Sequence, residues 1–481
     1  MKIKFVNATL GGDYSALDIA ITSLATYLNE KTDHKATVTD LMFRRRHWKK
    51  KILSDIERDK PDIIGFSTST MYMRYTASVA AFIKKHHNLP VILGGYHASL
   101  KPEETLQLDE VDAVCIGDGE YTLTEYLNRL QRKEDASGIP GIWIKREGRI
   151  YKTEKGSFIR NIDSLPIPNW DLWEDLDLYF YFLGMLYIIG TRGCPYRCTY
   201  CDAHGISKAV DGPYYRLRDP VKYAREIAFQ WEKYKHRNLR LAQLFDQIPT
   251  ADVKWLRTFC EAYMETGAWK KLKYSMFSRI DQLDEEKIDL LAKSGCVLLR
   301  VGIEAGNDFI RNEIYGKRIS KKQIKEIFRI ARSKGIGFTA FNMLGGPAET
   351  PATLRETIKL ATELDAERTA FFIYKPFTEE GCRQIHRYGG WIDLDRWRTA
   401  DNITFGAVVC SAKLSPRKVE FYQMVAYLLT FGKRLFKMLR RHKLRYFMNL
   451  FAYLAKGIRY GTDFGYTMIY FHIYGYDNVY K

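Results

Sequence analysis

The sequence predicts an α/β protein with three parts: an amino-terminal parallel sheet, a partial (β/α)6 barrel and a helical carboxyl-terminal region. Short apolar segments alternate with segments of helical periodicity over the first 140 residues, and again between about 186 and 390. Such alternation is typical of parallel strands joined by right-handed crossovers. Beyond residue 390 the alternation stops and the pattern becomes helical and basic.

The domain boundaries follow from these changes of pattern. We expect a first domain over 1–140, a linker over 141–185, a barrel over 186–390 and a helical basic domain over 391–481. Within the linker, a hairpin is expected around Glu147 and Gly148, and Pro166 and Pro168 indicate a stiff connector.

Three strand ends of the first domain carry small and polar residues. The strands are predicted in DIIGFSTST, PVILGGYHAS and DAVCIGDGEYT. In an open parallel sheet, ligands bind at the carboxyl ends of the strands. The first strand is not followed by the G-x-G-x-x-G pattern, since NATLGGD has two adjacent glycines and no third. A dinucleotide site is therefore disfavoured.

Six strands are predicted in the barrel region, in the segments LYIIGTRG, LRLAQLFD, KYSMFSRI, CVLLRVGIE, GFTAFNMLGG and RTAFFIYKPF. Helical stretches such as KKQIKEIFRIARSKG and PATLRETIKLATELD separate the later ones. A barrel of this kind carries its chemistry at the carboxyl ends of the strands.

Three cysteines follow the first of these strands in TRGCPYRCTYC. Cys194, Cys198 and Cys201 have the spacing C-x3-C-x2-C, and thiolates bind soft metals. Three thiolates can hold three irons of a cubane cluster and leave the fourth iron open. Zinc would need a fourth ligand, for which His204 is the nearby candidate, and inert buried thiols are a further alternative.

The stretch GCPYRCTYC resembles the cluster motif of the radical S-adenosylmethionine (SAM) superfamily. The resemblance implies a [4Fe–4S] cluster whose open iron chelates SAM, and cleavage of SAM to a 5′-deoxyadenosyl radical. It also implies SAM contacts from Tyr200 and from later strand ends. By resemblance the candidates are Tyr200, Asp246, Ser278, Arg279, Arg300, Glu304, Asn342 and Gly345, with Gly346 and Pro347 in the same loop as Gly345. A solvated loop residue or a turn glycine is the alternative for each.

The first domain resembles the Rossmann-like cobalamin-binding domain that precedes the radical SAM barrel in one large subfamily. The resemblance implies that cobalamin lies against the strand ends, without the D-x-H-x-x-G motif that ligates cobalt. The implied lining residues are Ser67, Thr68, Ser69, Gly94, Gly95, His97, Gly117, Gly119 and Glu120. His97 is either a neighbour of the lower face of the corrin or a residue that only satisfies a turn.

The resemblance to the class B radical SAM methyltransferases implies methyl transfer from methylcobalamin to an unactivated carbon. A cobalamin-dependent cyclase or rearrangement enzyme is the alternative within this fold. A non-catalytic cobalamin- or nucleic-acid-binding iron–sulfur protein is the alternative from another class. Cys382 follows the sixth strand and is a further candidate for the active site.

Composition bounds the partners of the protein. The net charge is +18, which favours an anionic partner such as a nucleic acid, a membrane surface or a phosphorylated substrate. No nucleic-acid-binding module is recognisable. We expect a small-molecule, lipid or protein substrate and an external one-electron reductant such as flavodoxin or ferredoxin. The basic stretch 433–460 predicts either a solvated helix face or peripheral membrane contact.

The location of the protein is predicted from what the sequence lacks. MKIKFVNATL is too short and too polar for a secretory signal, and no apolar run reaches about 20 residues. Cysteines are also few and unevenly spaced, which favours metal binding or buried thiols over a disulfide framework. We therefore expect a cytoplasmic protein.

Overall fold

The computed structural model of the chain describes residues 1–10 and 17–441. Contacts between Cα atoms divide it into two units. Among the described residues, the first unit contains Met1–Tyr179 and Ala203–Arg216, and the second contains Phe180–Asp202 and 217–441. Gly11 and Gly12 of the NATLGGD segment and the basic stretch from 442 lie outside the described residues.

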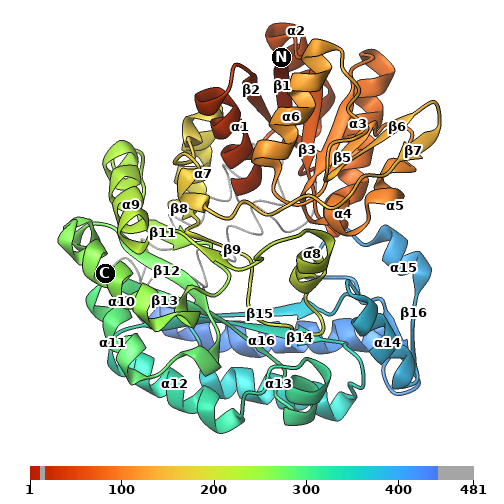
Figure 1. Cartoon of the computed structure of the whole chain (residues 1–481). Helices are drawn as coiled ribbons and strands as arrows, with labels where there is room; N and C mark the ends of the chain where they lie inside the picture. Colours follow the sequence, from red (N-terminus) through yellow and green to blue (C-terminus); the bar gives the residue numbers. More distant parts are fainter. Residues whose placement is uncertain (11–16, 442–481) are drawn as a thin grey trace. The chain divides into compact units, whose positions relative to one another are not determined.

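The first unit is built on a seven-stranded sheet with the strand order β2-β1-β3-β4-β5-β6-β7 (Figure 1). Strands β1 to β5 pair in parallel, and β6 and β7 add an antiparallel edge. The strands are β1 Lys2–Asn7, β2 Lys35–Asp40, β3 Ile63–Ser67, β4 Val91–Gly94, β5 Ala113–Cys115, β6 Ile142–Arg146 and β7 Arg149–Tyr151. The helices are α1 Ile19–Lys31, α2 Trp48–Asp59, α3 Met73–His86, α4 Gly95–Leu100, α5 Pro102–Leu106, α6 Gly119–Arg132 and α8 Ala203–Ala209.

Strand β1 shows why this sheet forms. Five of its six residues are buried, because a central parallel strand has both faces covered by helices. The run includes Lys4, which is 1% exposed. Its ammonium group donates to Thr37 Oγ1 at 3.0 Å and forms an ion pair with Asp59. A buried lysine is tolerated there because its charge is paired and hydrogen-bonded.

The hairpin predicted around Glu147 and Gly148 is confirmed as β6 and β7. These strands continue the sheet of the first unit. The rest of the expected linker contains the helix α7, Leu176–Leu183, which spans the point where the two units divide. The domain boundaries at 140, 185 and 390 stay predictions.

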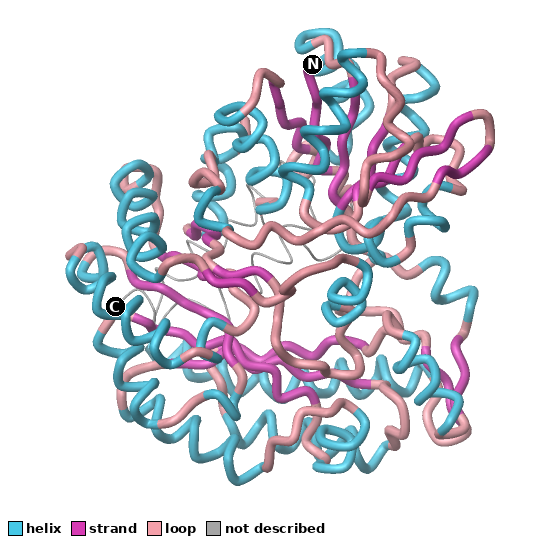
Figure 2. The backbone as a smooth tube through the Cα atoms, viewed as in Figure 1, coloured by secondary structure: helices cyan, strands magenta, loops and turns pink. Residues whose placement is uncertain are grey.

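The second unit is built on a six-stranded parallel sheet with the order β15-β14-β13-β12-β11-β8. All six predicted barrel strands are present in the predicted sequence order. They are β8 Met185–Ile188, β11 Leu241–Leu244, β12 Lys273–Ser278, β13 Cys296–Glu304, β14 Gly337–Leu344 and β15 Arg368–Ile373. The short strands β9 Thr191–Arg192 and β10 Arg216–Leu217 lie outside this sheet. The curved sheet is the partial barrel that the sequence predicted (Figure 2).

The crossover helices of the second unit are α9 Pro220–Tyr234, α10 Val253–Glu265, α11 Glu285–Lys293, α12 Lys321–Ser333 and α13 Pro351–Leu364. Their starts follow sequence signals. Ser320 and Gln323 form a capping box at α12, and Thr350 caps α13 with Pro351 in its first turn. Many of the aromatic residues fill the core: Trp255 stacks on Phe259 with ring centroids 5.5 Å apart.

The carboxyl-terminal region is mainly helical as far as it is described, which confirms the prediction. After α14 Glu379–Arg387 it contains α15 Leu394–Thr399 and α16 Pro416–Arg441, together with a short antiparallel pair of strands, β16 Gly390–Ile392 and β17 Val409–Ser411. Helix α16 packs against β15 and α13 and extends the layer of helices on the sheet (Figure 1). No helix within residues 1–10 and 17–441 combines the length and apolarity needed to cross a bilayer.

Candidate functional site

The three clustered cysteines lie on the loop that follows β8, in the second unit. Each of these three cysteines is half-buried as a residue. The backbone N–H of Cys201 donates to the carbonyl of Cys198 at 3.1 Å, which folds the second half of the motif into a turn. Thr199 anchors this turn, because its hydroxyl donates to Ile314 O at 2.6 Å and its carbonyl accepts from Thr378 Oγ1 at 2.6 Å. The loop is therefore held from two sides by the same unit.

The arrangement of the three cysteines can be compared with the needs of a single zinc ion and of a cubane iron–sulfur cluster. No three His, Cys, Asp or Glu side chains of the described residues are close enough to share one metal ion. A tetrahedral zinc needs its donors about 2.3 Å from one centre. In a cubane cluster each thiolate binds a different iron, so the sulfurs stand farther apart. A donor set of three thiols fits a cubane cluster, because each thiolate binds an iron of its own.

A cationic side chain stands beside the cysteine loop. Arg279 follows β12, is 5% exposed and donates from Nη1 to Cys198 Sγ at 3.2 Å. Burial raises the pKa of Cys194, while Arg279 and Lys317 lower it through their positive charge. A thiolate is the form that binds metal, and these two cations favour it.

Asp246 follows β11 and binds the backbone at the start of the loop that carries the cysteines. Its carboxylate is fully buried and accepts from Gly190 N at 2.7 Å and from Tyr223 Oη at 2.6 Å. Burial raises its pKa, although these hydrogen bonds lower it. Both oxygens are thus occupied by the protein. The structure gives Asp246 the role of fixing the start of the loop, and its direct contact with SAM stays a prediction.

Ser278 lies at the end of β12 and is also bonded within the protein. Its hydroxyl pairs with Thr250 Oγ1 at 2.7 Å, and both residues are buried. Asn342 of β14 is 1% exposed, and its amide donates to Ala370 O at 3.3 Å. These two predicted SAM contacts tie neighbouring strand ends together.

The end of β13 carries a buried polar network. Glu304 has a φ of 64°, a left-handed conformation that is uncommon for a residue with a side chain. Its Oε1 accepts from Tyr200 Oη at 2.8 Å and pairs with Lys317 Nζ at 2.9 Å. Lys317 also donates to Gly302 O at 3.1 Å. The network joins the cysteine loop to β13, and Arg300 lies in the same strand with its guanidinium 5.6 Å from the Phe277 ring centroid.

Lys317 was missed by reasoning from the sequence. It lies in the segment IYGKRIS, which shows no motif, and it meets Glu304 only because the chain folds back after the strand. Glu349 was quoted within FNMLGGPAET but was not assigned a role. Its Oε2 accepts from Gly345 N at 2.6 Å and Gly346 N at 2.9 Å. Burial raises the pKa of Glu349 to about 8, although these hydrogen bonds lower it.

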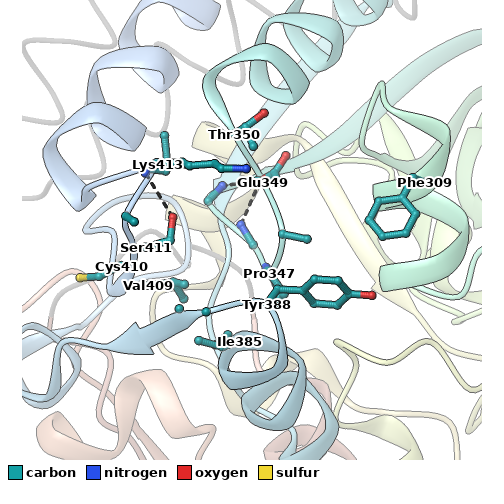
Figure 3. A pocket seen from close by; sticks show the side chains of 17 residues that line it. Phe309, Pro347, Glu349, Thr350, Ile385, Tyr388, Val409, Cys410, Ser411 and Lys413 are labelled. Carbon is teal, nitrogen blue, oxygen red and sulfur yellow. Dashed lines mark hydrogen bonds between the residues drawn. The ribbon is translucent and has the colours of Figure 1, made fainter.

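Glu349 also lies at the edge of a cavity of about 410 Å³ (Figure 3). The cavity is formed by the loop after β14, by α14 and by the two strands of the carboxyl-terminal region. Phe309 and Tyr388 form one rim, with ring centroids 6.1 Å apart. None of the three clustered cysteines lines it. Cys382 is the fourth candidate thiol and lies in α14. Its Sγ donates to Pro376 O at 3.8 Å, and the residue does not line the cavity either.

In the first unit, the predicted cobalamin residues gather at one edge of the sheet. They follow β3, β4 and β5, whose carboxyl ends lie side by side because the strands are parallel neighbours. Ser67, Ser69, Gly94, Gly95, Gly117 and Gly119 are partly accessible, whereas Thr68, His97 and Glu120 are buried. The accessible members leave backbone available at this edge for a large flat ligand.

His97 has a partner inside the protein. It is 3% exposed, and its Nδ1 lies 3.2 Å from Thr70 Oγ1. Burial lowers its pKa, which favours the neutral ring. The alternative in which His97 satisfies a turn has structural support, and its position as a neighbour of the corrin stays a prediction.

The glycines of this edge are required for different reasons. Gly95 has a φ of 88°, and a Cβ there would lie 2.7 Å from the backbone of Thr68. A Cβ on Gly117 would meet Val210, and one on Gly119 would meet Leu24, both within 3 Å. These three glycines serve the packing of the domain itself. Gly94 differs, since its nearest neighbour would be Cys115 O at 3.7 Å. Of these four glycines, Gly94 alone lies where the packing of the protein would accept a larger side chain.

Two regions of the chain match known domain families. Residues 3–127 match the B12 binding domain, and residues 188–361 match the radical SAM superfamily. The first range covers strands β1 to β5, and the second covers the barrel sheet from β11 to β14. The first domain implies cobalamin, and the second implies a [4Fe–4S] cluster and SAM.

Several curated proteins are similar to the chain. An uncharacterized methyltransferase of Pyrococcus horikoshii is 28% identical over 328 residues, which are 67% of this chain and 68% of that protein. The anaerobic magnesium-protoporphyrin IX monomethyl ester cyclase of Cereibacter sphaeroides is 25% identical over 68% of the chain, which spans about half of the cyclase, 53%. The cytidylyl-2-hydroxyethylphosphonate methyltransferase of Streptomyces wedmorensis is 23% identical, covering 68% and 67%.

Solved structures share the fold. The methyltransferase TsrM from Kitasatospora setae, with tryptophan substrate and a SAM analogue bound, superposes with a TM-score of 0.70 at 20% identity, covering 89% of each chain. The radical enzyme OxsB, with aqua-cobalamin and SAM bound, gives a TM-score of 0.62 at 19% identity, covering 76% of this chain and 52% of its own. Radical SAM enzymes act on a substrate and draw an electron from an external reductant. The chain therefore contains a B12 binding domain followed by a radical SAM domain, and it is similar to cobalamin-dependent radical SAM methyltransferases and to a cyclase.

Proposed function

We propose that the protein transfers a methyl group from cobalamin to an unactivated carbon of its substrate. One observation carries the proposal: three half-buried cysteines follow β8 in the same unit where β12, β13 and β14 carry buried polar residues at or near their carboxyl ends. A site for an iron–sulfur cluster and a site for SAM would then adjoin each other. The matched B12 binding domain supports cobalamin as a further cofactor.

Cys194, Cys198 and Cys201 would hold the cluster and leave one iron open for SAM. Tyr200, Arg300 and Gly345 are the predicted SAM contacts that the proposal keeps, although Tyr200 Oη donates to Glu304 and Gly345 N–H donates to Glu349. Asp246, Ser278, Glu304 and Asn342 already bond within the protein, so we assign them to positioning these groups. Cobalamin would lie on the accessible loops after β3, β4 and β5, among them Ser67, Ser69 and Gly94.

The bound cofactors would supply a carbon radical from SAM and a methyl group from cobalt. The protein's own task is to orient the substrate and keep water and reactive side chains away. The buried strand ends serve this task, because hydrogen bonds within the protein hold Asp246, Ser278 and Asn342 in fixed positions.

The cysteine motif provides the first test. We expect alanine at Cys194, Cys198 or Cys201 to abolish both the brown colour of anaerobically reconstituted protein and the release of 5′-deoxyadenosine from SAM with reductant. Cys260 lies buried in α10 and serves as the matched control. Its alanine variant should keep both properties, because a buried free cysteine acts as a small hydrophobe. Full 5′-deoxyadenosine release by all three motif variants would contradict the proposal.

Ring closure or rearrangement is the second candidate, since a cyclase is among the similar proteins. The two reactions differ in the fate of the SAM methyl group. With SAM labelled in that methyl, methyl transfer carries label into the product through cobalamin, whereas ring closure leaves the product unlabelled.

The remaining partners belong to the same proposal. We infer a cytoplasmic enzyme reduced by a flavodoxin or ferredoxin, and a small-molecule, lipid or protein substrate that is anionic, because the net charge is +18. Peripheral membrane contact would come from the stretch 433–460, most of which lies outside the described residues.

A further inference from the structure

Arg279 makes an unusual set of contacts. Its Nη1 donates to Cys198 Sγ at 3.2 Å, although the resemblance placed this residue against SAM. The guanidinium lies 3.9 Å from the ring centroid of Tyr196, which belongs to the same cysteine motif. The side chain therefore meets the motif through a sulfur atom and through an aromatic face.

The other donors of Arg279 are held in place. Nε and Nη2 each donate to the Asp281 carboxylate at 2.9 Å, in a bidentate pair. Nη2 also donates to Lys317 O at 2.9 Å. A bidentate pair fixes the plane of a guanidinium, and the residue is only 5% exposed. Arg279 is thus oriented so that Nη1 faces the sulfur, and little of the fork is left to grip a carboxylate of SAM.

We propose that Arg279 is a positioning residue that sets the reduction potential of the cluster through its hydrogen bond to Cys198, with Asp281 moderating its charge. The proposal rests on the proposed function, because it requires that Cys198 be a ligand of a [4Fe–4S] cluster.

The physical basis is the change in charge on reduction. One electron enters from the external reductant, no bond breaks, and the added negative charge spreads onto the sulfurs. A cationic donor on a ligand sulfur stabilises the reduced state more than the oxidised state. Arg279 thereby makes the cluster easier to reduce. Asp281 opposes it, since the carboxylate offsets the positive charge next to the sulfur.

Two substitutions should move the midpoint potential in opposite directions. Arg279→Met removes the donor and the charge, so the potential should become more negative. We expect a roughly tenfold fall in the ratio of reduced to oxidised cluster at a fixed potential, which is about 59 mV for one electron. Asp281→Asn keeps the shape but removes the opposing charge, so the potential should become less negative. The measurement is an EPR-monitored redox titration of the reconstituted protein without SAM.

Arg257→Gln is the matched control, because this arginine pairs with Glu286 at the surface and makes no contact with the motif. Its potential should equal that of the unchanged protein. General loosening of the site would shift both test variants in the same direction, so opposite signs support the proposal. Three outcomes would overturn it. The two test variants could have the potential of the unchanged protein, both could shift with the same sign, or Arg279→Met could lose SAM affinity at an unchanged potential. If the unchanged protein forms no cluster, the proposed function fails as well. If it forms a cluster whose potential does not depend on Arg279, only the proposed role of Arg279 fails.

Discussion

Glu349 is a buried carboxyl group with incomplete hydrogen bonding. It is 3% exposed, and its Oε1 has no hydrogen-bond partner among the described residues. Burial raises its pKa from 4.5 to about 8. The folded state therefore holds a proton that the unfolded state has already lost above pH 4.5. Stability should fall as pH rises from about 4.5 to about 8, because proton release is then coupled to unfolding.

Glu349→Gln should remove this dependence. Glutamine keeps an oxygen for Gly345 N and Gly346 N and carries no charge at any pH. We expect the variant to exceed the unchanged protein in apparent melting temperature by a few degrees at pH 8, and to match it near pH 5. Scanning calorimetry from pH 4.5 to 8.5 measures the difference, from which other titrating groups cancel. A difference that does not vary with pH would contradict the assignment.

Gly94 and Gly95 form a natural pair for testing the predicted cobalamin edge. A methyl group on Gly94 makes only ordinary contacts within the protein, whereas one on Gly95 meets the Thr68 backbone at 2.7 Å with a φ of 88°. Gly94→Ala should keep the stability of the protein but weaken binding of hydroxocobalamin about tenfold, because the methyl intrudes on the ligand. Gly95→Ala should lower stability by about 1–3 kcal/mol.

Absorption titrations with hydroxocobalamin and thermal unfolding separate the two effects. If Gly94→Ala binds cobalamin as tightly as the unchanged protein, the corrin does not lie on this loop. The comparison matters because the sequence alone treats both glycines alike. A GG pair predicts a turn, but only the folded structure shows which member is crowded by its own chain.

At the scale of elements, the Tyr200–Glu304–Lys317 network connects the cysteine loop, the end of β13 and the segment before α12. Lys317→Met should cost about 3–5 kcal/mol, because it leaves the Glu304 charge buried with one partner fewer. The double variant with Glu304→Gln should recover part of that loss. Lys325→Met is the control, since this exposed lysine pairs with Glu363 at the surface and should cost less than about 1 kcal/mol.

Urea unfolding monitored by circular dichroism gives these differences in the free energy of unfolding. Lys317→Met and its double variant with Glu304→Gln should also be reconstituted with iron and sulfide. A cost for Lys317→Met no larger than that for Lys325→Met would show that the network does not stabilise the strand end.

The elements themselves were largely predictable, whereas their contacts were not. Apolar runs bounded by polar turns located all six barrel strands, because periodicity and composition are local signals. Lys317 carries no such signal, since its partner Glu304 is 13 positions away on another element. The strands β16 and β17 were missed for a related reason: each has three residues, too few for an alternating pattern to show.

At the scale of the whole molecule, each of the two units carries one part of the chemistry. The B12 match lies in the first and the barrel strands of the radical SAM match lie in the second. The sequence could predict this division because a Gly-rich parallel sheet and a cysteine motif are each recognisable alone. It could not predict that residues 203–216 join the first unit, because that depends on long-range packing such as Gly205 against Leu100.

Hydrogen exchange should therefore resolve the two cofactor sites within one intact chain. Hydroxocobalamin should slow amide exchange in the loops after β3, β4 and β5, around Ser69, His97 and Gly119, because ligand binding suppresses local opening. SAM added to the cluster-loaded protein should instead slow exchange around Arg300 and Gly345. Gly94→Ala protein exposed to the same cobalamin concentration should show weaker protection in the first set and unchanged protection in the second. Cobalamin protection confined to the barrel strand ends would reverse the assignment of the two sites, since each ligand must stabilise the loops that it touches.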